Sequence, residues 1–359
     1  MDRIVDNTGA GAHRRFSRGA RLFLAPFLLP LLLCAGGASA AGYSCPRTPG
    51  ISPEMGIVSR YYGPSVDATF STMNPRAVDQ QKPVRARVAA PVVLLNRLAD
   101  DYSRADDLDR REVGECISGL VHEMARHAYL TQPKSKEDRY YRDWLMVATL
   151  TTLLGIDDDH LDKALDSRTR EWISGAAAES EAFFRSQPPD NHYYWNGLSL
   201  ILSGAVLRDT SIEDAGKRVL SRGISQINEQ GMLPAEVARG KRATHYHLFA
   251  AIPLAAMDHV EGVGKQAALS RLTRAILLDL SEGKAGPIAK IAGPQDPSES
   301  LPGLRLLGRY LPEDRALKSF YLATIAEQPD SFFFLGGSVK RFESALDRSR
   351  ARLQGTRAE

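Results

Sequence analysis

Apolar residues recur every three to four positions along most of the chain, which is the spacing of one buried face of an α-helix. Residues 116–128 and 212–227 show this period most clearly. Four further segments have the same pattern: 141–154, 196–207, 247–260 and 266–280. We therefore predict a succession of helices of similar length.

Short polar or glycine- and proline-containing segments separate the predicted helices. Residues 155–159 read GIDDD, and Gly286 is followed directly by Pro287. Short links favour antiparallel neighbours, and no segment stands out with the alternating pattern of a β-strand. The pattern predicts a single all-α domain at residues 41–347, either a bundle or a helical toroid. Residues 348–359 are charged and small, and we expect them to be disordered.

The first 40 residues have the features of a signal peptide. A basic segment, 14–21, precedes an apolar run, 22–34, and the sequence ASA at residues 38–40 is typical of a cleavage site. The apolar run is shorter than the roughly 20 residues that span a bilayer as a helix. We expect cleavage after Ala40 and export to the periplasm or beyond it, with no membrane span afterwards. An uncleaved N-terminal anchor is the alternative.

Removal of this segment changes the charge of the protein. The full chain has 46 basic and 43 acidic residues, and the first 40 residues contain five arginines and two aspartates. Cleavage would therefore leave 41 residues of each sign. A neutral protein binds an anion through a local cluster of charge, and this composition does not favour nucleic acid as a partner.

Two cysteines remain after cleavage, Cys45 and Cys116. An even pair in an oxidising compartment is most simply one disulfide, which would attach the N-terminal segment of the mature chain to a helix. Two free thiols are the alternative, and a metal site would need more ligands than these two.

The segment PPDNHYYW, residues 188–195, places polar and aromatic side chains next to one another before an apolar helical pattern. Its two prolines favour an extended entry, so Asp190 or Asn191 can cap the following helix. Asn191 and His192 would then lie at a helix N-terminus, where backbone N–H groups favour an anion. A helix cap with aromatic packing and no further role is the alternative.

A second polar segment, EVARGKRATHYH at residues 236–247, also precedes a predicted helix, one helical hairpin further along the chain. Two polar segments at loop-to-helix junctions can meet at one end of an all-α domain. An exposed basic loop is the alternative. The polar residues of the second segment are Glu236, Arg239, Lys241, Arg242, His245, Tyr246 and His247.

Other chemistries fit the sequence less well. His192, His245 and His247 could form a metal site, but residues two apart on a helix point about 200° away from each other. We therefore expect no metal and no other cofactor. A serine nucleophile would need a Gly-x-Ser-x-Gly turn and a phosphate site a glycine-rich loop, and the sequence contains neither.

Asparagine, arginine, histidine and tyrosine together can remove a proton next to a carboxylate. Asparagine and arginine donate hydrogen bonds to the carboxylate as its negative charge grows, and histidine or tyrosine accepts the proton. Tyrosine has an ordinary pKa near 10, so an adjacent arginine would have to favour its phenolate form. The natural substrate for this set is a uronic-acid polymer that is cleaved by β-elimination.

The two polar segments resemble the alginate lyase family, the poly(β-D-mannuronate) lyases of the bacterial periplasm. Residues 191–195 with the following Gly197, and residues 239–247 with their His-Tyr-His, carry this resemblance. The resemblance implies an incomplete (α/α) toroid with a deep groove. It also implies metal-independent eliminative cleavage of mannuronate-rich chains, and we expect the protein to act as a monomer.

The resemblance also implies roles for individual residues. Tyr246 matches the catalytic tyrosine and His192 the family histidine. Which of the two is the base stays open, and His192 could instead hold the substrate carboxylate. Asn191 and Arg239 match the groups that neutralise the substrate carboxylate. The residues expected to bind the substrate are Arg60, Tyr61, Trp144, Tyr194, Trp195, Arg242 and His245.

Two other functions remain as alternatives. An (α/α)-toroid glycoside hydrolase would need two carboxylates as acid and base, for which Glu236 and Asp190 are the candidates. A non-catalytic homologue in polysaccharide export would keep the arginine and aromatic residues and release no product.

Overall fold

The computed structural model describes residues 42–58, 69, 71–262, 267–296 and 300–358. The predicted signal peptide and the predicted substrate-binding residues Arg60 and Tyr61 lie outside the described residues. The prediction of residues 41–347 as one domain stays a prediction.

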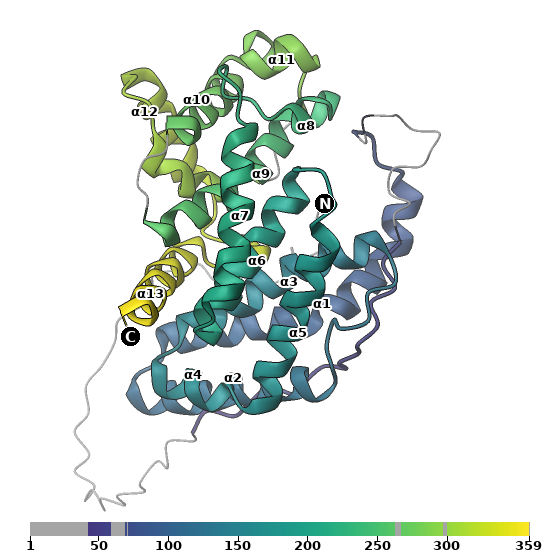
Figure 1. Ribbon diagram of the computed structural model, residues 1–359, viewed down its shortest axis with the longest axis vertical. Coiled ribbons are helices and arrows are strands. Elements are labelled where there is room, and N and C mark those ends of the chain that lie inside the picture. The colour runs from purple at the N-terminus through teal and green to yellow at the C-terminus, as the bar shows by residue number, and fades with distance from the viewer. Residues whose placement is uncertain (1–41, 59–68, 70, 263–266, 297–299, 359) are drawn as a thin grey trace, which may run out of the picture.

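The described chain folds into α-helices joined by turns and short 3₁₀ segments (Figure 1). Within it, backbone pairing of the β type is limited to two isolated bridges, Glu54 with Gln132 and Phe332 with Gly337. The all-α class predicted from the hydrophobic period is therefore confirmed. The α-helices are α1 (Pro75–Arg104), α2 (Asp107–Arg126), α3 (Lys136–Gly155), α4 (Asp158–Ala164), α5 (Ser167–Phe184), α6 (Asn191–Leu207), α7 (Thr210–Gln226), α8 (Pro234–Val237), α9 (Ala243–Glu261), α10 (Ala267–Glu282), α11 (Pro287–Ala292), α12 (Arg315–Glu327) and α13 (Val339–Ala358). The 3₁₀ segments are η1 (Gly240–Arg242), η2 (Gly283–Ala285), η3 (Leu301–Tyr310) and η4 (Phe333–Leu335).

Aspartates in the polar breaks begin several of the helices. Asp157, in the GIDDD break, accepts a hydrogen bond from the backbone N–H of His160 and caps α4. Other aspartates cap α2, α5, α6, α7 and α12 in the same way. Each cap satisfies N–H groups that have no partner inside the helix, which typically contributes about 1 kcal/mol. The breaks in the hydrophobic pattern therefore fix where these helices start.

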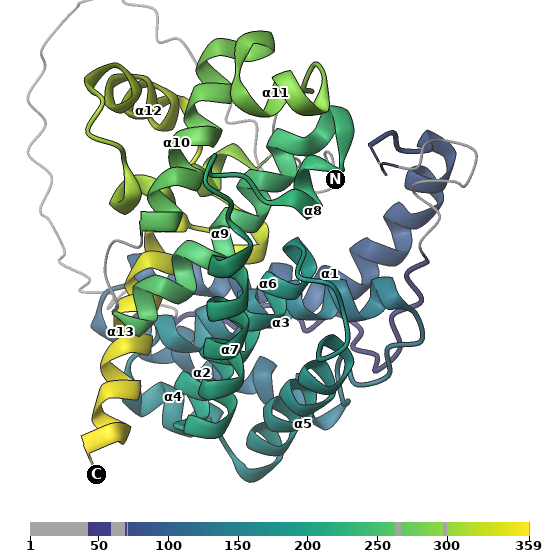
Figure 2. The same ribbon diagram turned by 45° about the horizontal axis from the view of Figure 1, so that its top comes forward.

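Helix α6 lies at the centre of the fold and is buried along nearly all of its length. It packs on α3, α5, α7, α9 and α13, and Figures 1 and 2 show α7 running beside it. Glycine allows this close approach, because a Cβ on Gly216 would meet Ile201 Cγ1 at 2.4 Å and the Gly197 oxygen at 2.9 Å. A larger residue at 216 would push the two helices apart.

A buried polar network fixes α6 against α3 and α5. Asn196 donates hydrogen bonds to Asp143 Oδ2 at 3.3 Å and to Ser180 Oγ at 2.7 Å. Arg142 forms ion pairs with Asp143 and Glu179. Burial raises the pKa of Asp143, and the Arg142 charge opposes this shift. A network of this kind is costly to desolvate, but it specifies one relative position of the helices.

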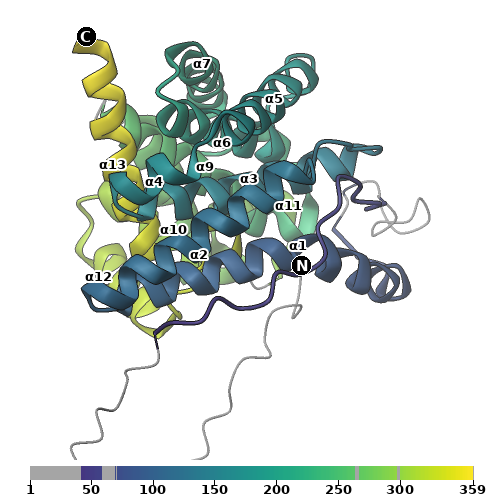
Figure 3. The same ribbon diagram turned by 90° about the horizontal axis from the view of Figure 1, so that it is seen from below.

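The helices form two groups, seen from two further directions in Figures 2 and 3. Helices α1 to α5 make up the lower part of Figure 1, and α8, α10, α11 and α12 make up the upper part, with α6, α7 and α9 between them. Helix α13 packs against α3, α6 and α9. Of the helices that the structure describes, none has the length and apolar character needed to cross a membrane.

The prediction of a disordered tail is wrong, because α13 continues to Ala358. Leu353 is buried, and Arg352 donates a hydrogen bond to the Ala205 oxygen at 3.1 Å and pairs with Asp158 at 3.0 Å. The charged residues of this segment therefore hold the last helix onto the ends of α4 and α6.

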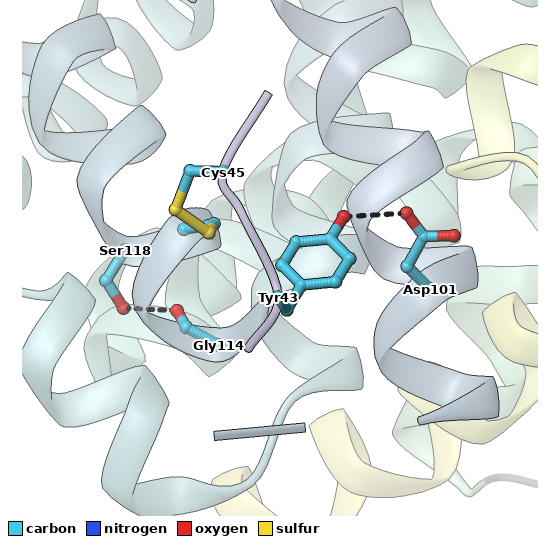
Figure 4. Close-up of a disulfide and its surroundings, with 6 residues drawn as sticks. Tyr43, Cys45, Asp101, Gly114 and Ser118 are labelled. Atoms are coloured by element: carbon cyan, nitrogen blue, oxygen red, sulfur yellow. Dashed lines mark hydrogen bonds between the residues drawn. A yellow bond between two sulfur atoms is a disulfide. The ribbon is translucent and has the colours of Figure 1, made fainter. Parts of the chain in front are cut away.

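The predicted Cys45–Cys116 disulfide is present, with Cα atoms 5.5 Å apart. It attaches the extended N-terminal segment to α2 (Figure 4). In the same segment, Tyr43 donates a hydrogen bond to Asp101 of α1 at 2.8 Å. The two contacts together hold this segment, which has no regular secondary structure, against α1 and α2.

Loss of the disulfide is expected to lower the free energy of unfolding by about 4 kcal/mol, because the bond joins residues 71 positions apart. Cys45→Ser removes the bond at its exposed end. Denaturant unfolding of the variant and the wild-type protein, each with and without reductant, measures the difference. Reductant should lower the wild-type midpoint only, and equal midpoints for the two proteins without reductant would contradict this role.

Candidate active site

The N-terminus of α6 is formed as the sequence predicted. Asp190 is the cap, and its Oδ1 accepts a hydrogen bond from the Tyr193 backbone N–H at 3.2 Å. Asn191 and His192 therefore occupy the first turn of the helix. Asn191 is fully buried, whereas His192 is only partly buried.

Glu236 joins the first polar segment to the second. Its Oε1 accepts a hydrogen bond from the Asn191 backbone N–H at 2.7 Å, and both carboxylate oxygens lie 3.2 Å from Asn191 Nδ2. Both residues are fully buried. Burial, followed by the nearby Asp190 charge, raises the pKa of Glu236 to about 8, and Arg239 and the Asn191 hydrogen bonds oppose the shift.

His192 stacks with two aromatic rings of α3. The centroids of the Tyr140 and His192 rings are 3.7 Å apart, and their planes differ by 8°. The centroids of the Trp144 and His192 rings are 5.5 Å apart, and their planes differ by 24°. Burial lowers the pKa of His192 to about 4, Asp190 opposes this, and Arg239 adds to it. The imidazole is therefore neutral near pH 7. Its Nδ1 has no hydrogen-bond partner among the described residues.

Tyr246 lies beneath two guanidinium groups. The Arg239 Cζ is 3.9 Å from the centroid of the phenol ring, and the Arg242 Cζ is 5.6 Å from it. These distances place two positive charges close to the phenol ring, as in a cation–π contact. Tyr246 is 7% exposed, and the His245 ring meets it edge-on at 4.9 Å.

His247 has a structural role. Its Nε2 accepts a hydrogen bond from the Leu233 backbone N–H at 3.0 Å, and its Nδ1 donates to the Ala243 oxygen at 2.8 Å. Both ring nitrogens are thus occupied, and burial lowers its pKa to about 4. This geometry removes His247 from the three-histidine metal alternative. No group of three metal-binding side chains occurs in the described ranges.

A row of rings connects the two polar segments. Trp144, which stacks on His192, meets Phe249 edge-on at 5.5 Å. Phe249 in turn stacks on His245 at 6.0 Å, next to Tyr246. The prediction that the two segments meet at one place in the fold is therefore confirmed.

Two predicted substrate-binding residues are core residues instead. Tyr194 and Trp195 are fully buried. The Tyr194 hydroxyl donates to the Pro189 oxygen at 2.8 Å, and the Trp195 indole donates to the Phe249 oxygen at 3.0 Å. Direct contact of these two rings with a substrate is therefore a wrong prediction, because their polar atoms already serve the fold. Of the remaining predicted residues, Trp144 and His245 belong to the row of rings, and Arg242 lies beside Tyr246. All three are buried.

Sequence reasoning missed Tyr140 and misread Glu236. Tyr140 precedes Trp144 by four residues, so both lie on one face of α3, and this spacing was a usable signal. Glu236 was considered only as a hydrolase acid. Its bonding to Asn191 depends on the packing of α8 beside α6, which no local pattern shows.

A cavity of about 670 Å³ lies elsewhere, between the ends of α1 and α3 and the start of α13. It contains none of the predicted site residues, and its arginines are engaged within the fold. Arg341 pairs with Asp100, and Arg348 donates to the Leu154 oxygen at 3.2 Å. We therefore place the candidate active site at the meeting of α3, α6, α8 and α9.

The chain is similar to known proteins over the region that contains the two polar segments. The alginate lyase family matches residues 138–261, which include both polar segments. A polysaccharide lyase of Stenotrophomonas maltophilia is 27% identical over 72% of this chain and 78% of its own. An alginate lyase of Pseudomonas fluorescens is 24% identical over the same shares of the two chains.

Solved structures share the fold. Alginate lyase A1-III complexed with a tetrasaccharide superposes with a TM-score of 0.63 at 17% identity, covering 84% of this chain and 86% of that one. Alginate lyase A1-III from Sphingomonas species A1 gives a TM-score of 0.62 at the same identity, covering 84% of this chain and 87% of that one.

The matched structures share the (α/α) toroid, which confirms the predicted fold. The family match and the named relatives support the predicted class of enzyme, a polysaccharide lyase. Within that class, the resemblance to the alginate lyase family is confirmed, and the family match covers the helices that carry the site.

We expect the His192 imidazole to stay neutral at about pH 6 and to titrate with a midpoint of about 4, because Tyr140 and Trp144 shield its faces. NMR titration of the ring measures this midpoint. Tyr140→Ala uncovers one face and should move the midpoint toward 6.5, whereas Tyr140→Phe, which keeps the stacked ring, should not. A wild-type midpoint near 6.5 would show that the stack does not desolvate His192.

Proposed function

We propose that the protein cleaves a uronic-acid polymer by β-elimination. The observation that carries the proposal is the position of Tyr246 beneath Arg239 and Arg242, beside a row of rings that leads to the neutral His192. This is the set of groups that a proton transfer next to a carboxylate requires.

In the proposed reaction, Arg239 binds the substrate carboxylate through its fork of N–H groups, which match the two carboxylate oxygens. Tyr246, as phenolate, takes the proton from C5. The electron pair of that bond forms the C4–C5 double bond as the bond from C4 to O4 breaks. Tyr246 then returns the proton to O4, so atoms and charge balance.

His192 has a neutral imidazole in this scheme. Neutral imidazole can accept a proton or donate a hydrogen bond without adding positive charge. It therefore suits either a share in the base role or a contact with the sugar.

The hydrolase alternative loses its proposed acid. Both oxygens of Glu236 lie against Asn191 in a fully buried position, so this carboxyl cannot reach a glycosidic oxygen. Asp190 is engaged as the cap of α6. The pair therefore lacks the open geometry that glycoside hydrolysis needs.

For the substrate, we propose an alginate-like polymer rich in mannuronate. Relatives from two genera are described as polysaccharide lyase and alginate lyase. The matched structure of alginate lyase A1-III contains a tetrasaccharide. Incubation with mannuronate-rich and guluronate-rich alginate, pectate and hyaluronan, followed by ultraviolet absorbance of the new double bond, tests both the reaction and the substrate. Absence of the double bond with every polymer would refute the proposal.

We further propose that the protein is exported, starts at Ala41 and acts as a monomer. The basic and apolar segments before residue 41 and the Cys45–Cys116 disulfide favour an oxidising compartment outside the cytoplasm. The mass of the exported chain tests this, and a chain that keeps its first 40 residues would contradict it.

Tyr246→Phe should lower turnover by about 10²–10⁴-fold and leave substrate binding nearly unchanged, because it removes one hydroxyl and keeps the ring. Tyr193→Phe is a matched control: Tyr193 is also 7% exposed and has an arginine, Arg222, 5.0 Å from its ring centroid. The control should have wild-type turnover. A folded Tyr246→Phe enzyme with near wild-type turnover would rule out this mechanism.

Activity should survive treatment with EDTA. Arg239 supplies the positive charge that would otherwise come from a cation, and both nitrogens of His247 are already bonded. Initial rates are compared before and after chelation and gel filtration. Loss of activity that one divalent ion restores would show that the reaction uses a metal.

A further inference from the structure

The two arginines beside Tyr246 belong to a turn with few hydrogen bonds of its own. Arg239 precedes η1 and Arg242 ends it, and α9 follows at once. The Arg242 N–H bonds to the Arg239 oxygen at 3.2 Å, and the Ala243 N–H bonds to the Gly240 oxygen. Arg242 is the cap residue of α9, but its side chain bonds to no N–H of the first turn. These N–H groups therefore need acceptors from elsewhere in the chain.

Gln295, which follows Thr244 by 51 residues, provides such an acceptor. Its Oε1 accepts a hydrogen bond from the Thr244 N–H at 2.9 Å. Its Nε2 donates to the Gly240 oxygen at 3.1 Å and to the Gly293 oxygen at 2.5 Å. The amide oxygen can only accept and the amide nitrogen can only donate, so one N–H group and two carbonyl oxygens fix this orientation of the side chain.

The Gln295 amide connects two parts of the candidate site. Gly240 directly follows Arg239 in the turn. Thr244 lies two residues before Tyr246 in α9. Because Gln295 bonds to both Gly240 and Thr244, it fixes the turn that carries Arg239 against the helix that carries Tyr246. The Arg239 Cζ is held 3.9 Å from the centroid of the Tyr246 ring at this junction.

Two further contacts hold the same region and do not involve the Gln295 side chain. The Asp296 N–H donates to the Lys241 oxygen at 2.7 Å. The Thr244 hydroxyl donates to Asp279 of α10. Helix α9 therefore stays attached to its neighbours when the Gln295 amide is removed. We expect such a change to shift the turn and to leave the fold intact.

We propose that Gln295 is a positioning residue, whose side-chain amide holds the Arg239 guanidinium in place over Tyr246. Gln295 acts through Arg239 and takes no part in the bond changes. The inference rests on the proposed function, because Arg239 is the group that binds the substrate carboxylate in the proposed reaction. A displacement of about 1 Å between reacting groups can lower turnover about 100-fold, so a single amide at this junction affects the rate.

Two substitutions separate the bonds of the amide. Gln295→Met keeps the length of the side chain and removes its hydrogen bonds. Gln295→Glu keeps an oxygen that accepts from the Thr244 N–H and removes the donor to Gly240. Asp314→Leu is the matched control, because it also removes a side chain that caps a helix. Asp314 bonds to two N–H groups at the start of α12, which packs on α10 and η3.

The first readout is turnover on the preferred polymer. Gln295→Met should lower kcat by about 10- to 100-fold, and Asp314→Leu should have wild-type kcat. In an Arg239→Lys background, Gln295→Met should lower kcat only about threefold or less, because the guanidinium that it positions is absent. A general effect on the fold would give the same loss in both backgrounds. Equal losses, or wild-type kcat in Gln295→Met, would overturn the proposal.

The second readout needs no activity. Hydrogen exchange of the Thr244 amide should be about tenfold faster in Gln295→Met than in wild type, because its acceptor is lost. Gln295→Glu should restore the protection of this amide, because the acceptor is present again, while its kcat stays low without the bond to Gly240. Asp314→Leu should exchange as wild type does. Equal exchange of Thr244 in Gln295→Met and wild type would overturn the proposal.

The third readout follows Arg239 directly. The ring current of Tyr246 shifts the NMR signals of a side chain that lies over its face, and Tyr246→Leu gives the signals of Arg239 without the ring. Gln295→Met should move the Arg239 signals toward those of Tyr246→Leu, and Asp314→Leu should not. Unchanged Arg239 signals in Gln295→Met would overturn the proposal. If these signals move but no polymer in the panel is cleaved, only the proposed function is refuted.

Discussion

The hydrogen bonds between Glu236 and Asn191 are the contact on which the candidate site depends. They connect the first turn of α6 to the segment that leads into α9, and so bring His192 and Tyr246 into one region of the fold. Helix α6 packs against α3, α5 and α7, and these contacts restrict the position of its N-terminus. Each polar group of the site is positioned against this fixed end.

Burying a carboxyl at this position is unfavourable for folding near neutral pH, because a buried charge loses its hydration and a retained proton must be taken up. Burial lowers the pKa values of His192 and His247 to about 4, so for these residues the cost falls at acid pH, where the unfolded chain binds protons that the buried rings do not. Proteins commonly accept such costs at functional sites, where activity depends on groups in the less common protonation state. The resulting site combines a neutral imidazole and a buried carboxyl with the positive charges of Arg239 and Arg242, which lie beside Tyr246.

The sequence predicted the helices and the two polar segments because both signals are local. The helical period gives one apolar face, and Asp157 and Asp190 stand where the period breaks and cap the helices that follow. The roles of Tyr194 and Trp195 could not be predicted in this way. Helix α6 is buried all round, so its sequence has no polar face to show which of its side chains belong to the candidate site. The contact between Glu236 and Asn191 could not be predicted either, because the two residues lie on different helices and no local pattern relates them.

The central claim is that the enzyme eliminates rather than hydrolyses, and the masses of its products test this most directly. A defined mannuronate oligosaccharide is incubated with the protein, and both fragments of a single cleavage are weighed by mass spectrometry. Elimination adds no water, so the two masses should sum to that of the parent, and one fragment should contain a double bond. Fragments that together exceed the parent by one water molecule would show hydrolysis and would contradict the account.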